Sequence, residues 1–135
     1  MSHQLRFGLF GCVTMLVASI ALGSPSVSLI ELIANPTAQD AREVSVYGVF
    51  QFESGTAALF LSKDDARHSI GPNAIGLDLN PRSRIVSRAG NLVEPRRLNG
   101  HYVRVLGTVD SRGAQALARW RVLLKEVTEV VELSK

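Results

Sequence analysis

The sequence predicts an all-β fold, a small five-stranded barrel with short helices, on three observations. Several segments alternate apolar and other residues with the period of two that is typical of strands. Turn signals containing glycine separate these segments. One strand pattern, VSVYGVF from Val44 to Phe50, recurs in outline as VRVLGTV from Val103 to Val109, with a glycine at the fifth position of each copy.

The first 23 residues have the composition of a secretory signal peptide. A basic residue precedes an apolar run from Phe7 to Leu22, and small residues lead to a cleavage site between Gly23 and Ser24. Cleavage there predicts a periplasmic or secreted bacterial protein. Two alternatives remain: an uncleaved membrane anchor, because the run is slightly shorter than the roughly 20 residues that span a bilayer, and lipidation at Cys12, whose preceding residues resemble a lipobox.

Residues 24–135 are predicted to form a single domain. The only cysteine is Cys12, which lies in the predicted signal. A disulfide, a thiol nucleophile and a cysteine-ligated metal are therefore excluded from this domain. The chain carries 15 Lys and Arg against 12 Asp and Glu. Most of the basic residues are arginine, which favours paired contacts with carboxylate or phosphate groups.

The segment from Ser24 to Asn35 is predicted to be a short helix that docks on the domain. Ser28 and Glu31 have the spacing of a capping box, and Asn35-Pro36 ends the helix. Apolar residues occupy most of its circumference, so we expect it to be packed rather than solvated. These are Leu29, Ile30, Leu32, Ile33 and Ala34.

A half-buried strand is predicted from Glu43 to Phe52, followed by a turn at Ser54-Gly55 and a second strand from Ala57 to Leu61. Ser62 and Asp65 then form a second capping box, which opens a short helix. A third strand is predicted from Ala74 to Leu79.

Residues 81–99 are predicted to form an arginine-rich loop, because the sequence has no clean period there. A long stretch without regular structure is unusual inside a small domain. It is therefore a functional loop, a short and poorly signalled helix, or a mobile segment. Its arginines are Arg82, Arg84, Arg88, Arg96 and Arg97.

Two more strands complete the prediction, one from His101 to Asp110 and a final one that begins near Trp120. A long strand that belongs to both halves of a small barrel must bend, and a glycine removes the side chain that would clash at the bend. We assign this role to Gly48 and Gly107. A five-stranded Greek-key barrel of this kind is an OB-fold.

The order of these segments resembles that of small uncharacterised bacterial exported proteins with an OB-fold-like barrel. The resemblance covers most of residues 27–110, and it departs in the arginine-rich stretch. It implies a fold and brings no reaction or catalytic residues. The segments that carry it are VSLIELIANP, VSVYGVF, LFLSKDDARHSI, AIGLDL and NGHYVRVLGTVD.

The best metal-binding candidates are Asp64, Asp65 and His68, because spacings of three and four place side chains on one helical face. The set has no visible fourth ligand. The competing interpretation is a capped surface helix with acidic residues near its positive N-terminus. A small metal-dependent, hydrolase-like enzyme built on these residues is the alternative function.

We interpret the chain as an exported binding or interaction module without a cofactor or catalytic residues. Tyr47 and Gln51 face outward on the first strand, and the five arginines are expected to line a neighbouring rim. The expected partner is an unidentified envelope component: an anionic glycan, a lipid headgroup or an acidic protein segment. Nucleic acid is disfavoured because an exported protein meets little of it, and membrane contact is expected only through an uncleaved signal. The competing interpretation of the arginines is a solvated basic loop.

Overall fold

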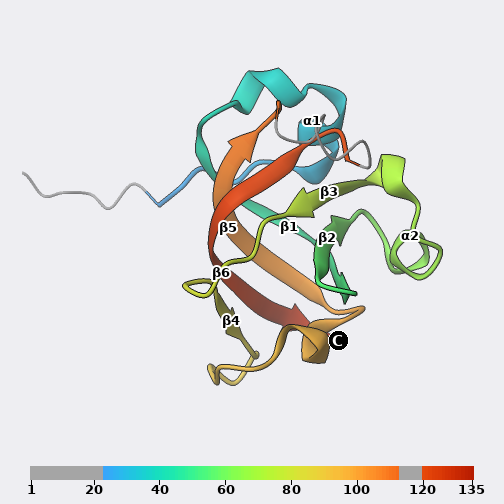
Figure 1. Ribbon diagram of the computed structural model, residues 1–135, viewed down its shortest axis with the longest axis vertical. Helices are drawn as coiled ribbons and strands as arrows, with labels where there is room; N and C mark the ends of the chain where they lie inside the picture. Colours follow the sequence, from blue (N-terminus) through green and yellow to red (C-terminus); the bar gives the residue numbers. More distant parts are fainter. Residues whose placement is uncertain (1–22, 113–119) are drawn as a thin grey trace, which may run out of the picture.

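The computed structural model describes residues 23–112 and 120–135, and in these ranges the chain is mostly β (Figure 1). Residues 1–22 of the predicted signal peptide, which include Cys12, therefore lie outside the described residues. Within the described ranges, no helix is long and apolar enough to cross a membrane. The elements are α1 (Leu29–Ala34), η1 (Pro36–Gln39), β1 (Glu43–Glu53), β2 (Thr56–Phe60), α2 (Lys63–Arg67), η2 (Gly71–Asn73), β3 (Ala74–Leu77), β4 (Arg84–Val86), η3 (Pro95–Leu98), β5 (Tyr102–Asp110) and β6 (Leu123–Ser134), where η marks a 3-10 helix.

Five of the strands form a closed ring of hydrogen-bonded pairs. β1 pairs antiparallel with both β2 and β5, β2 pairs with β3, and β5 pairs with β6. A parallel pairing of β3 with β6 closes the ring. β4 lies outside the ring and pairs in parallel with β6. The prediction of a mostly β chain is confirmed, but it missed β4, which makes a six-stranded sheet.

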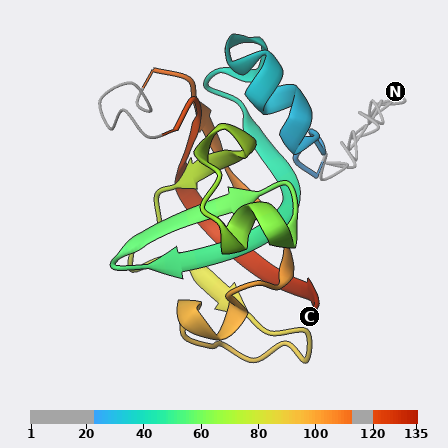
Figure 2. The same ribbon diagram turned by 90° about the vertical axis from the view of Figure 1, so that its right-hand side faces the viewer.

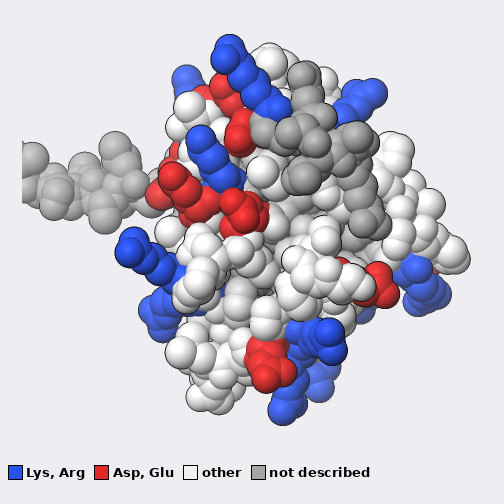
Figure 3. Space-filling model, in the orientation of Figure 1, with Lys and Arg blue, Asp and Glu red and all other residues white. Residues whose placement is uncertain are grey.

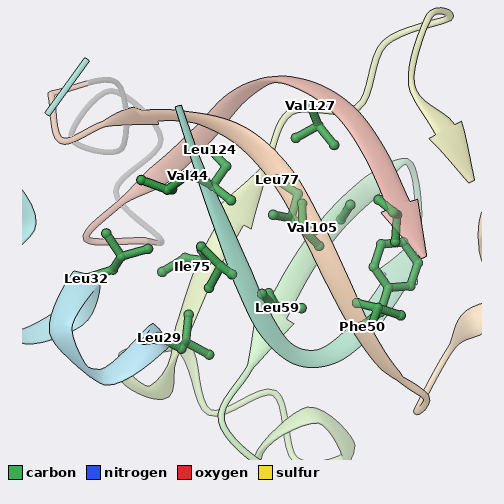
Figure 4. Close-up of a cluster of buried hydrophobic side chains, with 14 of the residues drawn as sticks. Leu29, Leu32, Val44, Phe50, Leu59, Ile75, Leu77, Val105, Leu124 and Val127 are labelled. Carbon is green, nitrogen blue, oxygen red and sulfur yellow. The ribbon is translucent and has the colours of Figure 1, made fainter. Parts of the chain in front are cut away.

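The main core fills the ring and extends under α1. Inward-facing residues of β1 and β5, such as Val44, Phe50 and Val105, are fully buried. Figure 4 shows Leu29 and Leu32 of α1 beside Val44 and Ile75 at one end of this core. Burying a leucine side chain contributes about 1.5–3 kcal/mol. The predicted docking of the helix is therefore confirmed.

The first helix is shorter than the sequence prediction. The hydroxyl of Ser28 accepts a hydrogen bond from the backbone N–H of Glu31 at 3.0 Å, so the helix begins immediately after Ser28. Residues 25–27 instead run extended beside β1. The N–H of Ser45 donates to the carbonyl of Pro25, and the N–H of Val27 donates to the carbonyl of Ser45, both at 3.0 Å.

A second buried cluster covers the outer face of β2 and β3. Figure 2 shows α2 lying over the β1–β2 hairpin, and Trp120 packs edge-on against Phe60 with ring centroids 6.0 Å apart. β1 is therefore buried along part of both faces, which corrects the prediction of a half-buried strand. The cluster consists of Val49, Ala58, Phe60, Ala66, Ala74 and Trp120.

Both predicted bend glycines lie where a long strand changes its pairing. β1 pairs with β5 as far as Val49 and with β2 from Val49 onward, so Gly48 immediately precedes the exchange of partners. The register between β5 and β6 shifts between Leu106 and Thr108, on either side of Gly107. Opposite this shift, Glu126 has a φ of 50°, as expected where a bulge re-aims a strand.

The arginine-rich segment contains β4 and η3, and hydrogen bonds hold the region around β4 in place. The hydroxyl of Ser83 donates to the carbonyl of Val127 at 2.5 Å. The N–H of Val93 donates to the carbonyl of Ile85 at 2.9 Å, so the chain folds back on β4. Both views place β4 and η3 at the end of the molecule opposite α1 (Figures 1 and 2).

Candidate functional site

The two residues predicted to bind on the first strand do not share a site. Tyr47 lies in the middle of β1, is 48% exposed, and pairs with Arg104 of β5. Gln51 lies four residues further on, about 13 Å away along an extended strand, and lines a groove at the end of the hairpin. The two hollows that Gln51 lines do not include Tyr47.

The five predicted arginines are all exposed, but they come from different elements. Arg82 precedes β4, Arg84 lies in it and Arg88 follows it, whereas Arg96 and Arg97 both belong to η3. Figure 3 shows basic side chains in separate groups on the visible face, one of them at the end that carries η3. Of the five, only Arg96 and Arg97 share an element.

Arg88 differs from the other four because Glu132 lies beside it. The backbone N–H of Arg88 donates to Glu132 Oε1 at 3.1 Å, and His101 Nδ1 contacts Oε2 at 2.5 Å. These two hydrogen bonds, the backbone one first, hold the pKa of Glu132 below its ordinary value. Among the described residues, none of the five arginines forms a salt bridge through its guanidinium group.

The contacts of Glu132 predict a pH-dependent contribution to stability. A carboxylate whose folded pKa is lowered stabilises the fold above its unfolded pKa, near 4.5, and this contribution is lost as the pH falls through the folded pKa. We expect Glu132→Gln to lower the free energy of unfolding at neutral pH by about 1–2 kcal/mol. In urea unfolding, its difference from the parent should shrink as the pH falls below 4.5.

Asp40 is a second carboxylate with a lowered pKa, but it does not disturb that comparison. The backbone N–H of Ser111, followed by its hydroxyl, lowers the pKa of Asp40, but this group titrates alike in the parent and in the variant and cancels in the difference. A difference that stays constant as acid is added would contradict the assignment to Glu132.

η3 is fixed against the end of β1. Leu98 is 1% exposed and belongs to the main core. The side chain of Asn99 accepts from the N–H of Phe52 at 2.7 Å and donates to the carbonyl of Phe52 at 2.9 Å. The N–H of Gly100 also donates to the carbonyl of Phe50. Arg96 and Arg97 are therefore presented on a backbone with a defined position.

A polar groove adjoins the residues that follow η3, Asn99 and Gly100. It encloses about 450 Å³ between the β1–β2 hairpin and α2, and its lining includes Gln51, Lys63, Arg67 and Asn99. It shares Gln51, Glu53 and Ser69 with a smaller hollow of about 160 Å³ that reaches Trp120. The groove therefore offers hydrogen-bonding groups and two cationic side chains.

An apolar hollow adjoins the first residue of η3. It is open to solvent, has a volume of about 500 Å³ and ends at Pro95, the first residue of η3. Leu92, which is 69% exposed, contributes to its wall. Much of its lining is aliphatic, from Leu79, Pro81, Ile85, Leu92, Val93 and Pro95.

We call η3 and its two arginines, Arg96 and Arg97, the η3 ridge. The apolar hollow includes Pro95, the first residue of the ridge, and the polar groove includes Asn99 and Gly100, which follow the ridge. The guanidinium groups of the ridge have no partner among the described residues. Guanidinium groups bind carboxylate and phosphate in pairs of hydrogen bonds. The arrangement suits an anion that is attached to an apolar group.

The sequence identified the two arginines of the ridge but not the hollow beside them. The sequence PRRL does contain a local signal, because proline favours the first turn of a helix and Leu98 supplies an apolar anchor. The hollow has no such signal, because its walls come from residues 79–85 and 92–95.

Asp64, Asp65 and His68 are engaged in local contacts around α2. Asp64 lies 3.6 Å from the guanidinium of Arg67, and its carbonyl lies 2.9 Å from His68 Nδ1. The N–H of Asp65 donates to the Ser62 hydroxyl, which confirms the predicted cap. Among residues 23–112 and 120–135, no three His, Cys, Asp or Glu side chains are placed to hold a metal ion.

Comparisons with protein families, with curated proteins and with solved structures find no match for this chain.

Proposed function

We propose that this chain is an exported, OB-fold-like binding module that takes an anionic amphiphile, an anionic lipid headgroup with its adjoining acyl group, at the η3 ridge. The closed ring, its parallel β3–β6 pairing and the two glycines at strand bends support an OB-fold-like Greek-key barrel. The resemblance of the sequence to small bacterial exported proteins supports the envelope as the compartment.

One observation carries the proposal: unpaired guanidinium groups stand next to an apolar hollow. Arg96 directly follows Pro95, which lines the hollow, and both Arg96 and Arg97 are exposed. A hollow of about 500 Å³ is in the size range of small-ligand sites, which combine apolar walls with a few polar groups. An anionic glycan would match the arginines but leave the apolar walls unused.

The usual ligand-binding face of an OB-fold is covered in this chain, which supports the ridge as the binding site instead. Barrels of this type bind through the outer face of their second and third strands. In this chain α2 and Trp120 cover that face, and Phe60 and Ala74 beneath them are buried. The ridge lies beyond this cover, at the end of β1.

We expect Arg96→Ala combined with Arg97→Ala to weaken binding to anionic vesicles by about 10- to 30-fold. Each arginine near an anionic membrane surface contributes about 1 kcal/mol. Co-sedimentation with vesicles of a neutral phospholipid, with and without an anionic phospholipid, measures the effect. The protein used begins at Ser24, since every described helix and strand follows that residue.

The matched control is Arg42→Ala combined with Arg121→Ala, which removes the same charge from exposed positions outside the ridge. We expect this control to bind nearly as well as the parent, and both double variants to keep the melting temperature, because exposed charges contribute little to stability. Equal losses in the two double variants would reject the ridge in favour of net charge. Stronger retention on heparin than on anionic vesicles would favour a glycan ligand.

A further inference from the structure

The residues that follow Ser24 are part of the fold. Ser26 pairs in parallel with Ser45 of β1, and two backbone hydrogen bonds of 3.0 Å join residues 25–27 to the same residue. Val27 is buried in the main core. The chain is therefore held along the edge of β1 from Pro25 onward.

Gly23 stands outside this contact. It is exposed, and a Cβ placed on it would meet no heavy atom within 4 Å. The peptide bond between Gly23 and Ser24 thus marks the change from exposed to docked chain. Hydrolysis of this bond would remove no hydrogen bond among those described.

Glu43 lies beside Ser24, which would become the N-terminus after such hydrolysis. The hydroxyl of Ser24 donates a hydrogen bond to the Glu43 carboxylate. Within one serine, the backbone nitrogen lies roughly 3–4 Å from the hydroxyl oxygen, so the nitrogen of Ser24 lies within roughly 6 Å of that carboxylate. Among the described residues Glu43 forms no ion pair.

We propose that Glu43 is the binding site for the α-ammonium group of Ser24, which cleavage after Gly23 exposes. A signal peptidase would add water across the bond, so that Gly23 leaves as a carboxylate at the end of residues 1–23 and the Ser24 nitrogen becomes a protonated amine. Cleavage thereby replaces the neutral amide nitrogen of Ser24 with an ammonium group. Its neighbour, the Glu43 carboxylate, has no other cationic partner among the described residues.

The charged groups around Glu43 determine how the pKa of the Ser24 amine would shift. β5 places Thr108 opposite Glu43, and Lys125 of β6 pairs with Thr108. Arg42 adjoins Glu43 in the sequence. Both neighbouring cations would lower the pKa of an added amine, whereas a nearby carboxylate raises it. A raised pKa of the amine therefore reports a carboxylate partner, and its loss in Glu43→Gln identifies that partner as Glu43.

The inference rests on export, as in the proposed function, but the ion pair is tested on protein made to begin at Ser24. NMR titration should give its α-amine a pKa above the ordinary 7.7–8.0. Glu43→Gln, which can still accept from the serine hydroxyl, should return the pKa to the ordinary range. A chain that keeps Gly23 is the matched control, because its amine lies one residue away from the docked position.

An ordinary amine pKa in the chain that begins at Ser24, or a raised one that Glu43→Gln leaves unchanged, would overturn the inference. Added salt gives a second measurement in the parent protein, where screening should lower the raised pKa. The intact mass of the exported protein tests the cleavage position separately, and a first residue other than Ser24 would overturn the processing step. None of these measurements involves vesicle binding. A negative result for the Ser24–Glu43 ion pair is therefore independent of whether the η3 ridge binds anionic lipid.

Discussion

Gly48→Val is expected to lower the free energy of unfolding by about 2–4 kcal/mol. A Cβ on Gly48 would lie 2.7 Å from Leu59 Cγ and 2.9 Å from the carbonyl oxygen of Phe60. The side chain of Leu59 is fully buried, and the carbonyl belongs to the residue that pairs with Val49. Neither atom has room to move without disturbing the core or the β1–β2 pairing.

Gly107→Val should fall at the lower end of that range. Its nearest contacts would be 3.2 Å to the carbonyl oxygen of Lys125 and 3.3 Å to Val127 Cγ2, which small shifts can relieve. Thr108→Val, a change of similar shape at the neighbouring position, should stay within about 0.5 kcal/mol. Urea unfolding compares the three variants. Losses below about 0.5 kcal/mol for both glycines would mean that they do not set the bends.

The second large effect is expected for Leu98→Ala, which should lower the free energy of unfolding by about 2–5 kcal/mol. Leu98 is 1% exposed and is the buried residue of η3, so its truncation leaves a cavity under the ridge. Vesicle binding should also weaken although every arginine remains, because Arg96 and Arg97 lose their fixed backbone. Thermal and urea unfolding, followed by co-sedimentation, measure both effects.

Leu92→Ala is the matched control for Leu98→Ala. Leu92 is 69% exposed, so the same truncation should change stability by no more than about 0.5 kcal/mol. A comparable loss of stability in both variants would show that residues 92–98 pack differently from the arrangement described above.

The sequence predicted the features that depend on interactions between residues close together in the chain. The hydroxyls of Ser28 and Ser62 cap their helices as the sequence indicated, and alternate residues of β5 are buried as its period of two required. Gly48 and Gly107 were recognisable because a bend excludes a side chain wherever it occurs in such a strand. These features need only a few neighbouring residues for their prediction.

The missed features depend on contacts between distant parts of the chain. β4 has only three residues, too few to show a period, and its strand partner is residues 129–131 of β6. The burial of Val49 on the second face of β1 was missed, because its cover, α2 and Trp120, comes from later parts of the sequence. The same limit applied to the site. The arginines were visible, but their distribution over β4 and η3 and the apolar hollow beside them required the fold.

NMR mapping of ligand contacts tests the η3 ridge most directly. A short-chain anionic phospholipid, kept below its micelle concentration, would be titrated into isotope-labelled protein that begins at Ser24. Binding at the η3 ridge should cause saturable shifts of the backbone amides in residues 96–100 and at the hollow walls, residues 79–85 and 92–94. The neutral analogue should cause much smaller shifts. Shifts centred on Tyr47 and Tyr102, or equal shifts with both lipids, would contradict binding at the ridge.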